Sequence, residues 1–195
     1  MTDIKKILTD KVKSIVDNWD ADGIYAISFF VESNENNTYN DYKNVSEFAV
    51  SYNTESECEG IGLYDEERWN YAFWLQNETY VIDTANVNEE TRKLYDWYAE
   101  HNITDIGRED EDCYDENMCY IGKGPVGHYE LLMLAAEVAR SLQSEGYIKR
   151  LFKTDVPIIV HGLEYVWYDI EATKLANPNN EAADFLKYVE MELGL

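Results

Sequence analysis

The chain has 195 residues, a length that fits one domain with a single core. Hydrophobic residues make up 45% of it and aromatic residues 14%, more than a disordered acidic chain carries. With 39 Asp and Glu against 16 Lys and Arg, the net charge of −23 argues against a surface that grips nucleic-acid phosphates or anionic lipid. No segment approaches the roughly 18 consecutive apolar residues of a membrane helix. We therefore expect a single cytoplasmic domain over residues 1–195.

The first part of the chain predicts one helix and two strands. Apolar residues follow helical spacing over residues 4–19, with Thr2 as the expected N-cap. Residues 24–31 form a nearly continuous apolar run rich in β-branched and aromatic side chains, which predicts a strand covered on both faces. After a polar loop over residues 33–44, residues 45–52 alternate apolar and polar side chains, so we expect a second strand antiparallel to the first.

Residues 54–83 fit two conformations. Trp69, Tyr71 and Phe73 alternate as in a strand, whereas Trp69 and Phe73 also sit one helical turn apart. The pattern alone does not choose between helix and strand here.

The second part of the chain predicts mainly helices. We expect a short buried strand over residues 156–160, and helices over 88–102, 125–146, 163–176 and 182–189. Because helices and strands do not alternate regularly, the predicted fold class is α+β, a small, mainly antiparallel sheet packed with several amphipathic helices.

Two patterns suggest ligands but do not satisfy the requirements of a site. Residues 122–127 match G-x-G-x-x-G, but the residues before them are acidic rather than a hydrophobic strand, and Pro125 lacks an amide donor. Cys113, Cys119 and His128, with Cys58, lack a common zinc spacing. We therefore expect a loop leading into a helix, free reduced thiols, and no cofactor or metal.

His161 follows the predicted strand over residues 156–160 and is close in sequence to Glu164, as for a general base at a strand end. No nucleophile motif such as G-x-S-x-G accompanies it, and a lone histidine at a strand end is commonly structural. An enzyme of unrecognised type that uses His161 with a nearby carboxylate is therefore the alternative hypothesis. No catalytic residue is assigned.

Acids and aromatic rings gather in the same part of the chain. Residues 21–91 hold 15 Asp and Glu but only two bases, Lys43 and Arg68. Six aromatic residues fall between positions 64 and 80, and most are expected in the core. Trp and Tyr also anchor protein interfaces, so one or two of these rings are candidates for exposure beside the acids.

Two segments resemble a known family. Residues 66–74 read EERWNYAFW, and residues 157–165 read PIIVHGLEY before the chain continues to Ala176, Asn177 and Pro178. With the opening helix and first strand, they resemble the bacterial family of uncharacterised proteins called domain of unknown function 4303. The resemblance covers nearly the whole chain but implies no catalytic residue. Some members of that family look like components of toxin-immunity neighbourhoods, which implies an inhibitor role.

These patterns favour a non-enzymatic, acidic protein-binding protein, plausible as an immunity-type inhibitor of a basic toxin. An anionic face speeds encounter with a cationic partner, and aromatic anchors add affinity. A DNA mimic, with regular surface rows of acids, is a third hypothesis. The expected contact residues are Glu55, Glu57, Glu59, Asp65, Glu66, Glu67, Trp69, Trp74, Glu109, Asp110, Glu111, Asp112, Asp115 and Glu116.

Overall fold

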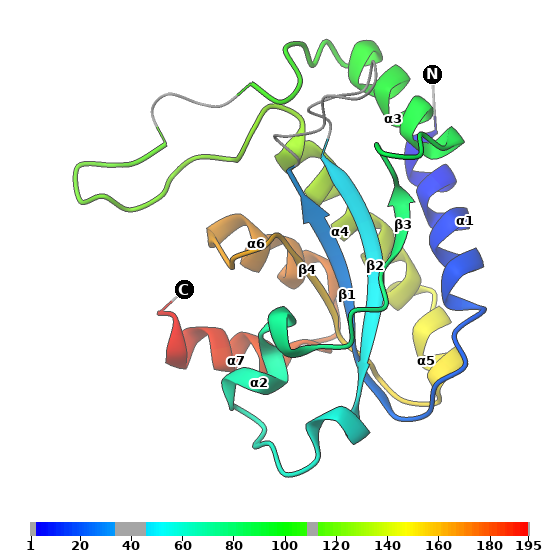
Figure 1. The fold of residues 1–195 in the computed structure, drawn as a ribbon, viewed down its shortest axis with the longest axis vertical. Helices are drawn as coiled ribbons and strands as arrows, with labels where there is room; N and C mark the ends of the chain where they lie inside the picture. Colours follow the sequence, from blue (N-terminus) through cyan, green and yellow to red (C-terminus); the bar gives the residue numbers. More distant parts are fainter. Residues whose placement is uncertain (1–2, 34–45, 109–112, 195) are drawn as a thin grey trace.

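The strands of the protein form one four-stranded sheet in a computed structural model that describes residues 3–33, 46–108 and 113–194 (Figure 1). In chain order they are β1 (Ile24–Glu32), β2 (Glu47–Thr54), β3 (Thr79–Ile82) and β4 (Ile158–His161), and the order in the sheet is β3-β2-β1-β4. β1 pairs antiparallel with β2, and β2 with β3, whereas β4 runs parallel to β1. The predicted α+β class with a mainly antiparallel sheet is confirmed.

The central strand β1 separates two hydrophobic cores. Successive side chains of a strand point to opposite faces, so Ile27 and Phe29 enter one core while Ala26 and the partly buried Phe30 enter the other. The expectation of a strand covered on both faces is confirmed. Its antiparallel pairing with β2 is also confirmed, with Phe29 opposite Val50. The polar loop predicted over residues 33–44 falls almost entirely outside the described residues.

The helices α1 (Ile4–Val16), α3 (Glu89–Glu100), α4 (His128–Ser144) and α5 (Tyr147–Phe152) pack against the larger core, and α6 (Trp167–Ala176) contributes Tyr168, Ala172 and Ala176 to it. A stripe at helical spacing on α1 faces inward, from Ile4 through Leu8 and Val12 to Val16. The described N-cap of α1 is Asp3, whose Oδ1 accepts a hydrogen bond of 3.1 Å from the backbone N–H of Lys6. The expected cap, Thr2, lies outside the described residues.

The smaller core lies on the opposite face of the sheet. It is closed by the short helix α2 (Glu66–Trp69), the C-terminal helix α7 (Ala183–Glu192) and two short 3₁₀ turns, η1 (Glu55–Cys58) and η2 (Tyr71–Phe73). Trp69 packs edge-to-face on Phe185 with ring centroids 5.8 Å apart, so α2 and α7 lie against each other (Figure 1).

The segment over residues 54–83, which fitted both helix and strand, contains neither over its whole length. It forms η1, α2 and η2 before ending in β3. Trp69 is buried and Phe73 is 56% exposed, so the two rings do not share one face of a longer helix.

The later helices and the strand confirm the predicted elements with two differences. Helix α6 (Trp167–Ala176) begins after Leu163, which is 77% exposed and not a helical core residue. Helix α5 was not predicted, because six residues give too short a periodic pattern. Among the described residues, no helix is long and apolar enough to cross a membrane.

Helix α6 lies along the outer edge of β4 and satisfies its backbone with side chains. The hydroxyl of Thr173 accepts from the N–H of Val160 at 2.9 Å and donates to its carbonyl at 3.0 Å. One turn later, the Asn177 amide accepts from the N–H of Ile158 at 3.0 Å and donates to its carbonyl at 2.7 Å. These four bonds replace those that a fifth strand would make.

Candidate functional site

Six carboxylates form an exposed surface on η1 and α2, hereafter the η1–α2 surface, and all six were predicted as contact residues. They are Glu55, Glu57, Glu59, Asp65, Glu66 and Glu67, and residues 55–67 contain no Lys or Arg. Helix α7 adds acids beside them, because the Tyr64 hydroxyl donates to Asp184 Oδ1 at 3.4 Å. The pKa of Tyr188 is raised by burial and then by the charges of Glu66, Glu192 and Glu67. Segments more than 100 residues apart therefore contribute to one anionic region.

A cleft of about 320 Å³ opens at this anionic region. Four carboxylates from three separate segments line it: Glu55, Asp155, Glu181 and Asp184. Trp69 and the buried Arg68 line it as well. Two of the four carboxylates are ion-paired, Glu55 with Arg68 and Asp155 with Lys149.

Arg68 is engaged by the protein itself. Its two terminal nitrogens donate to the Glu55 carboxylate at 3.0 and 2.7 Å, and its guanidinium lies 4.2 Å from the centroid of the Tyr25 ring. Burial lowers the pKa of Arg68, but the hydrogen bond and charge of Glu55 outweigh burial, so the pKa is raised. A bidentate carboxylate on an aromatic ring is strong guanidinium recognition, and Glu55 already provides it internally.

The two predicted tryptophan anchors are buried, which corrects that part of the prediction. Trp69 is 3% exposed and donates its indole N–H to the Leu63 carbonyl at 2.6 Å. Trp74 is 4% exposed and donates to the Arg68 carbonyl at 2.9 Å. Both rings therefore belong to the smaller core. Phe73 and Leu63, which are 56% and 44% exposed, are the large apolar side chains that reach the surface here.

The second predicted acidic segment does not join the η1–α2 surface within the described residues. Glu109, Asp110, Glu111 and Asp112 lie outside the described residues. Asp115 Oδ1 accepts from the backbone N–H groups of Asn117 and Cys119 at 2.8 and 2.9 Å, so this carboxylate organises a turn. Glu116 is exposed on the same loop, which projects from a different part of the molecule than η1 and α2 (Figure 1).

Some charges on the helices of the larger core are paired. Lys5 pairs with Glu137 at 3.5 Å, and Lys13 pairs with Glu145 at 3.0 Å, both between α1 and the end of α4. On the η1–α2 surface, Glu55 is the carboxylate with a described ion pair. None of the described ion pairs involves Glu57, Glu59, Asp65, Glu66 or Glu67, and acids without a described ion pair, such as Glu89 and Glu130, also lie on other helices.

His161 is a buried link between β4 and β1. It is 1% exposed, its Nε2 lies 2.8 Å from Ser28 Oγ, and its Nδ1 lies 2.7 Å from the Gly162 carbonyl oxygen. A carbonyl only accepts, so Nδ1 carries the proton and Nε2 accepts from the Ser28 hydroxyl. Burial lowers the pKa of His161 to about 4, although the hydrogen bond to Gly162 opposes this shift. Both nitrogens are occupied, so this geometry leaves neither free for a substrate proton.

The carboxylate that acts near His161 is Asp169, on the first turn of α6. Its oxygens accept from the N–H groups of Gly162 at 3.2 Å and Val166 at 2.9 Å, and so fix the connection from β4 to α6. Burial raises the pKa of Asp169 to about 7, while these two backbone hydrogen bonds oppose the shift. Glu164, the nearby carboxylate of the sequence hypothesis, is exposed.

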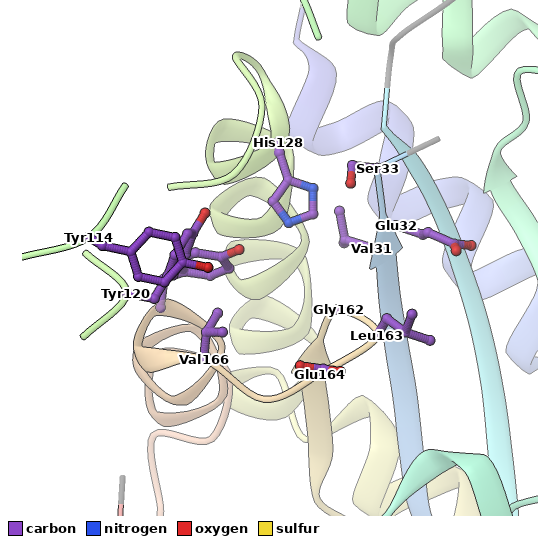
Figure 2. A pocket seen from close by; sticks show the side chains of 11 residues that line it. Val31, Glu32, Ser33, Tyr114, Tyr120, His128, Gly162, Leu163, Glu164 and Val166 are labelled. Atoms are coloured by element: carbon purple, nitrogen blue, oxygen red, sulfur yellow. The ribbon is translucent and has the colours of Figure 1, made fainter. Parts of the chain in front are cut away.

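A separate cavity of about 410 Å³ lies where the parallel strands β1 and β4 end (Figure 2). The first turns of α4 and α6 also reach it. Tyr114 and Tyr120 lie together on one side of it (Figure 2), Tyr168 also lines it, and Glu164 lies on the loop after β4. The lining residues are Val31, Glu32, Ser33, Tyr114, Tyr120, His128, Gly162, Leu163, Glu164, Val166 and Tyr168.

His128, the first residue of α4, directs its ring into this cavity (Figure 2). The ring is 5% exposed, and its Nδ1 lies 3.1 Å from Ser46 Oγ. Burial lowers the pKa of His128 to about 4. In the sequence, His128 stood out only as a possible metal ligand, although its place at the start of a helix after a glycine-rich loop was a usable signal.

The glycine-rich loop and the cysteines have structural explanations. Gly127, with φ of +92°, occupies the N-cap position of α4, so residues 122–127 lead into a helix as expected. Among the described residues, Cys58, Cys113 and Cys119 are not joined in disulfide bonds. Within residues 3–33, 46–108 and 113–194, no three His, Cys, Asp or Glu side chains are arranged to hold a metal ion.

Comparisons of the chain with protein-family models, with curated proteins and with solved structures gave no match in any of the three. The described residues form an α+β fold with an anionic region at η1, α2 and α7 and a separate tyrosine-lined cavity.

Proposed function

We propose that the protein is a non-enzymatic binding protein for a basic protein partner, and that the η1–α2 surface with the adjoining acids of α7 is the contact region. The supporting observation is the exposed acidic run over residues 55–67, which lies beside Glu181 and Asp184 of the cleft, while the cleft carboxylates Glu55 and Asp155 are paired with Arg68 and Lys149. Carboxylates placed close together repel one another, so they do not stabilise the fold. Their arrangement therefore favours a role in binding.

The proposed partner presents Lys or Arg side chains to this cleft. The negative field of the whole surface speeds the encounter with a cationic patch on the partner. The positions of the individual acids then select the docking orientation. Affinity requires apolar contacts as well. Leu63 lines the cleft, and Phe73 is exposed on the adjacent η2 turn, so these side chains take the anchoring role that the buried tryptophans cannot take.

An immunity-type role is the more specific form of the proposal. A toxin that acts on nucleic acid carries a basic surface for the phosphates, and an acidic inhibitor that covers it blocks access. The resemblance of residues 66–74 and 157–165 to domain of unknown function 4303 supports this reading, because members of that family look like parts of toxin-immunity neighbourhoods.

The test compares two matched variants as affinity baits in extract of the source cells. The contact variant carries Glu57→Gln, Glu59→Gln, Glu66→Gln and Glu67→Gln. The control variant removes the same number of charges from exposed positions on α1, α3 and α4 through Asp10→Asn, Glu89→Gln, Asp96→Asn and Glu137→Gln. Both have the same net charge, so any difference between them reports the position of the charge.

The expected result is a basic partner held by the wild type and the control variant and released by the contact variant. With purified partner, the contact variant should bind about tenfold or more weakly at low salt and show a shallower dependence on salt concentration. Equal retention by both variants contradicts the proposed contact region. A captured partner that is acidic, or whose binding does not weaken with salt, contradicts the proposed function.

A further inference from the structure

The two buried histidines differ in how many of their ring nitrogens are hydrogen-bonded to the described residues. Both nitrogens of His161 have partners, Ser28 and Gly162. His128 is also more than nine-tenths buried, but its described hydrogen bond is made by Nδ1 alone, with Ser46. Its Nε2 points into the cavity of Figure 2 and has no partner among the described residues. A ring nitrogen that faces a cavity without a hydrogen bond to the described residues is available to a ligand.

The surrounding structure fixes the direction of the His128 ring. Gly124, with φ of +70°, lies close against it: a Cβ at that position would be 2.9 Å from His128 Cδ2. The Tyr168 ring packs edge-to-face on the other side, with centroids 5.9 Å apart. With Nδ1 held at Ser46 as well, the ring is preorganised, which lowers the entropic cost of binding at Nε2.

The location also favours a small ligand. The cavity lies at the carboxyl ends of β1 and β4, the parallel pair in this sheet, and at the first turns of α4 and α6. Strand ends of this kind and cavities of roughly 300–1,000 Å³ are common ligand sites, and this one measures about 410 Å³.

The charge of the site selects against anions. At neutral pH the buried His128 ring is uncharged, because burial holds its pKa near 4. Glu32 and Glu164 line the same cavity, and the whole protein carries −23. Without a cationic side chain among the described lining residues, a phosphate or carboxylate has no counter-charge there. The cavity therefore suits a neutral or cationic ligand better than an anionic one.

Aromatic walls favour a flat ring. Tyr114 and Tyr120 pack edge-to-face at 5.4 Å, and Tyr120 and Tyr168 do so at 6.4 Å, which gives a continuous wall of rings. A neutral imidazole offers one hydrogen-bond site to the cavity at Nε2, and Glu164 offers acceptors. A ring that carries both an amino group and a ring nitrogen complements this combination.

We propose that this cavity binds a small neutral nitrogen heterocycle of the nucleobase or nucleoside class, and that Nε2 of His128 is its recognition contact. The ligand would stack on the tyrosine wall and place an amino group toward Glu164. This site is distinct from the anionic cleft: Glu55 and Asp184 line the cleft, and neither lines the cavity.

The test is a titration with adenine, adenosine, cytidine and adenosine 5′-monophosphate, followed by nitrogen NMR of the histidine rings. A nucleobase or nucleoside should move the Nε2 signal of His128 and leave both ring nitrogens of His161 unchanged, because those are already occupied. The monophosphate should bind at least about tenfold more weakly than adenosine at low salt. Tighter binding of the monophosphate, or no movement of the His128 signal at millimolar probe, overturns the proposal.

Two variants and a control complete the experiment. His128→Gln should weaken binding about tenfold, in line with the loss of one oriented hydrogen bond in a buried site. Val166→Phe should abolish binding by filling the cavity, whereas Val87→Phe, before α3, should leave binding unchanged. Amide spectra show whether each variant is folded. If a variant is not folded, the response of the wild-type His128 signal to the probes decides between the outcomes. Unchanged affinity in folded Val166→Phe refutes the site.

Discussion

The buried link between Ser28 and His161 makes a quantitative prediction about acid stability. The His161 imidazole has an ordinary pKa of 6.5, and burial lowers it to about 4 in the folded protein. As pH falls from about 7.5 to about 5, the unfolded chain takes up a proton at this ring while the folded protein does not. The free energy of unfolding therefore falls with pH, and His161 alone accounts for a loss of about 2 kcal/mol over this range.

The contribution of His161 can be separated from that of other groups by comparing the wild type with His161→Gln. The variant keeps a neutral polar side chain that does not take up a proton at these pH values. Denaturant unfolding, followed by tryptophan fluorescence at both pH values, should show that the wild type loses about 2 kcal/mol more than the variant on acidification. Equal losses would refute the reasoning. So would a ring-nitrogen titration of wild-type His161 with a pKa near 6.5, which remains measurable if the variant does not fold.

Two further predictions concern burial. Trp69→Ala should lower the free energy of unfolding by about 3–5 kcal/mol, whereas Phe73→Ala, on the exposed ring, should change it by about 0.5 kcal/mol or less; similar losses in denaturant unfolding would contradict the assigned cores. Burial raises the pKa of Asp169 to about 7, so its carboxylate ionises less readily in the folded protein than in the unfolded chain. The free energy of unfolding of the wild type should therefore fall as the pH rises from about 4 to about 7. The stability of Asp169→Asn relative to the wild type should therefore improve by about 2 kcal/mol between about pH 5 and about pH 7.5, and a difference that does not change with pH would disprove the shift.

Local patterns predicted the elements whose own residues determine their environment. The stripe of α1 and the apolar run of β1 each carry enough consecutive signal to define type and burial. The pairing of β1 with β2 followed from alternation in adjacent segments. Residues 54–83 could not be assigned in the same way, because three short elements share the segment and each is too brief for a periodic pattern.

Long-range contacts decided what the sequence left open. Phe29 pairs with Val160 in the parallel ladder of β1 and β4, although the two residues are far apart in the sequence. No local pattern specifies this pairing. Trp69 is buried against Phe185 of α7, and Trp74 packs on Tyr25 and Tyr71 in the same core. The expected exposure of an indole was therefore wrong even though the adjacent carboxylates are exposed.

The candidate sites show the same division. Acid content indicated the η1–α2 surface, because exposed carboxylates can be expected without knowledge of the fold. The cleft could not be expected, since Asp155 and Asp184 come from distant segments. The sequence drew attention to His161 at the strand end, but both of its ring nitrogens have hydrogen-bond partners within the protein. His128, at the start of α4, faces a cavity instead.

The side-chain bonds from Thr173 and Asn177 to β4 have a consequence for how the protein behaves at high concentration. An open strand edge is a template on which a second molecule can add its own strand, and repeated addition leads to fibrils. On β4 the outward-facing N–H and carbonyl groups of Ile158 and Val160 are already used by a helix of the same molecule. Polymerisation through this side of the sheet would first require α6 to detach, so two polar side chains guard an apolar strand against self-association.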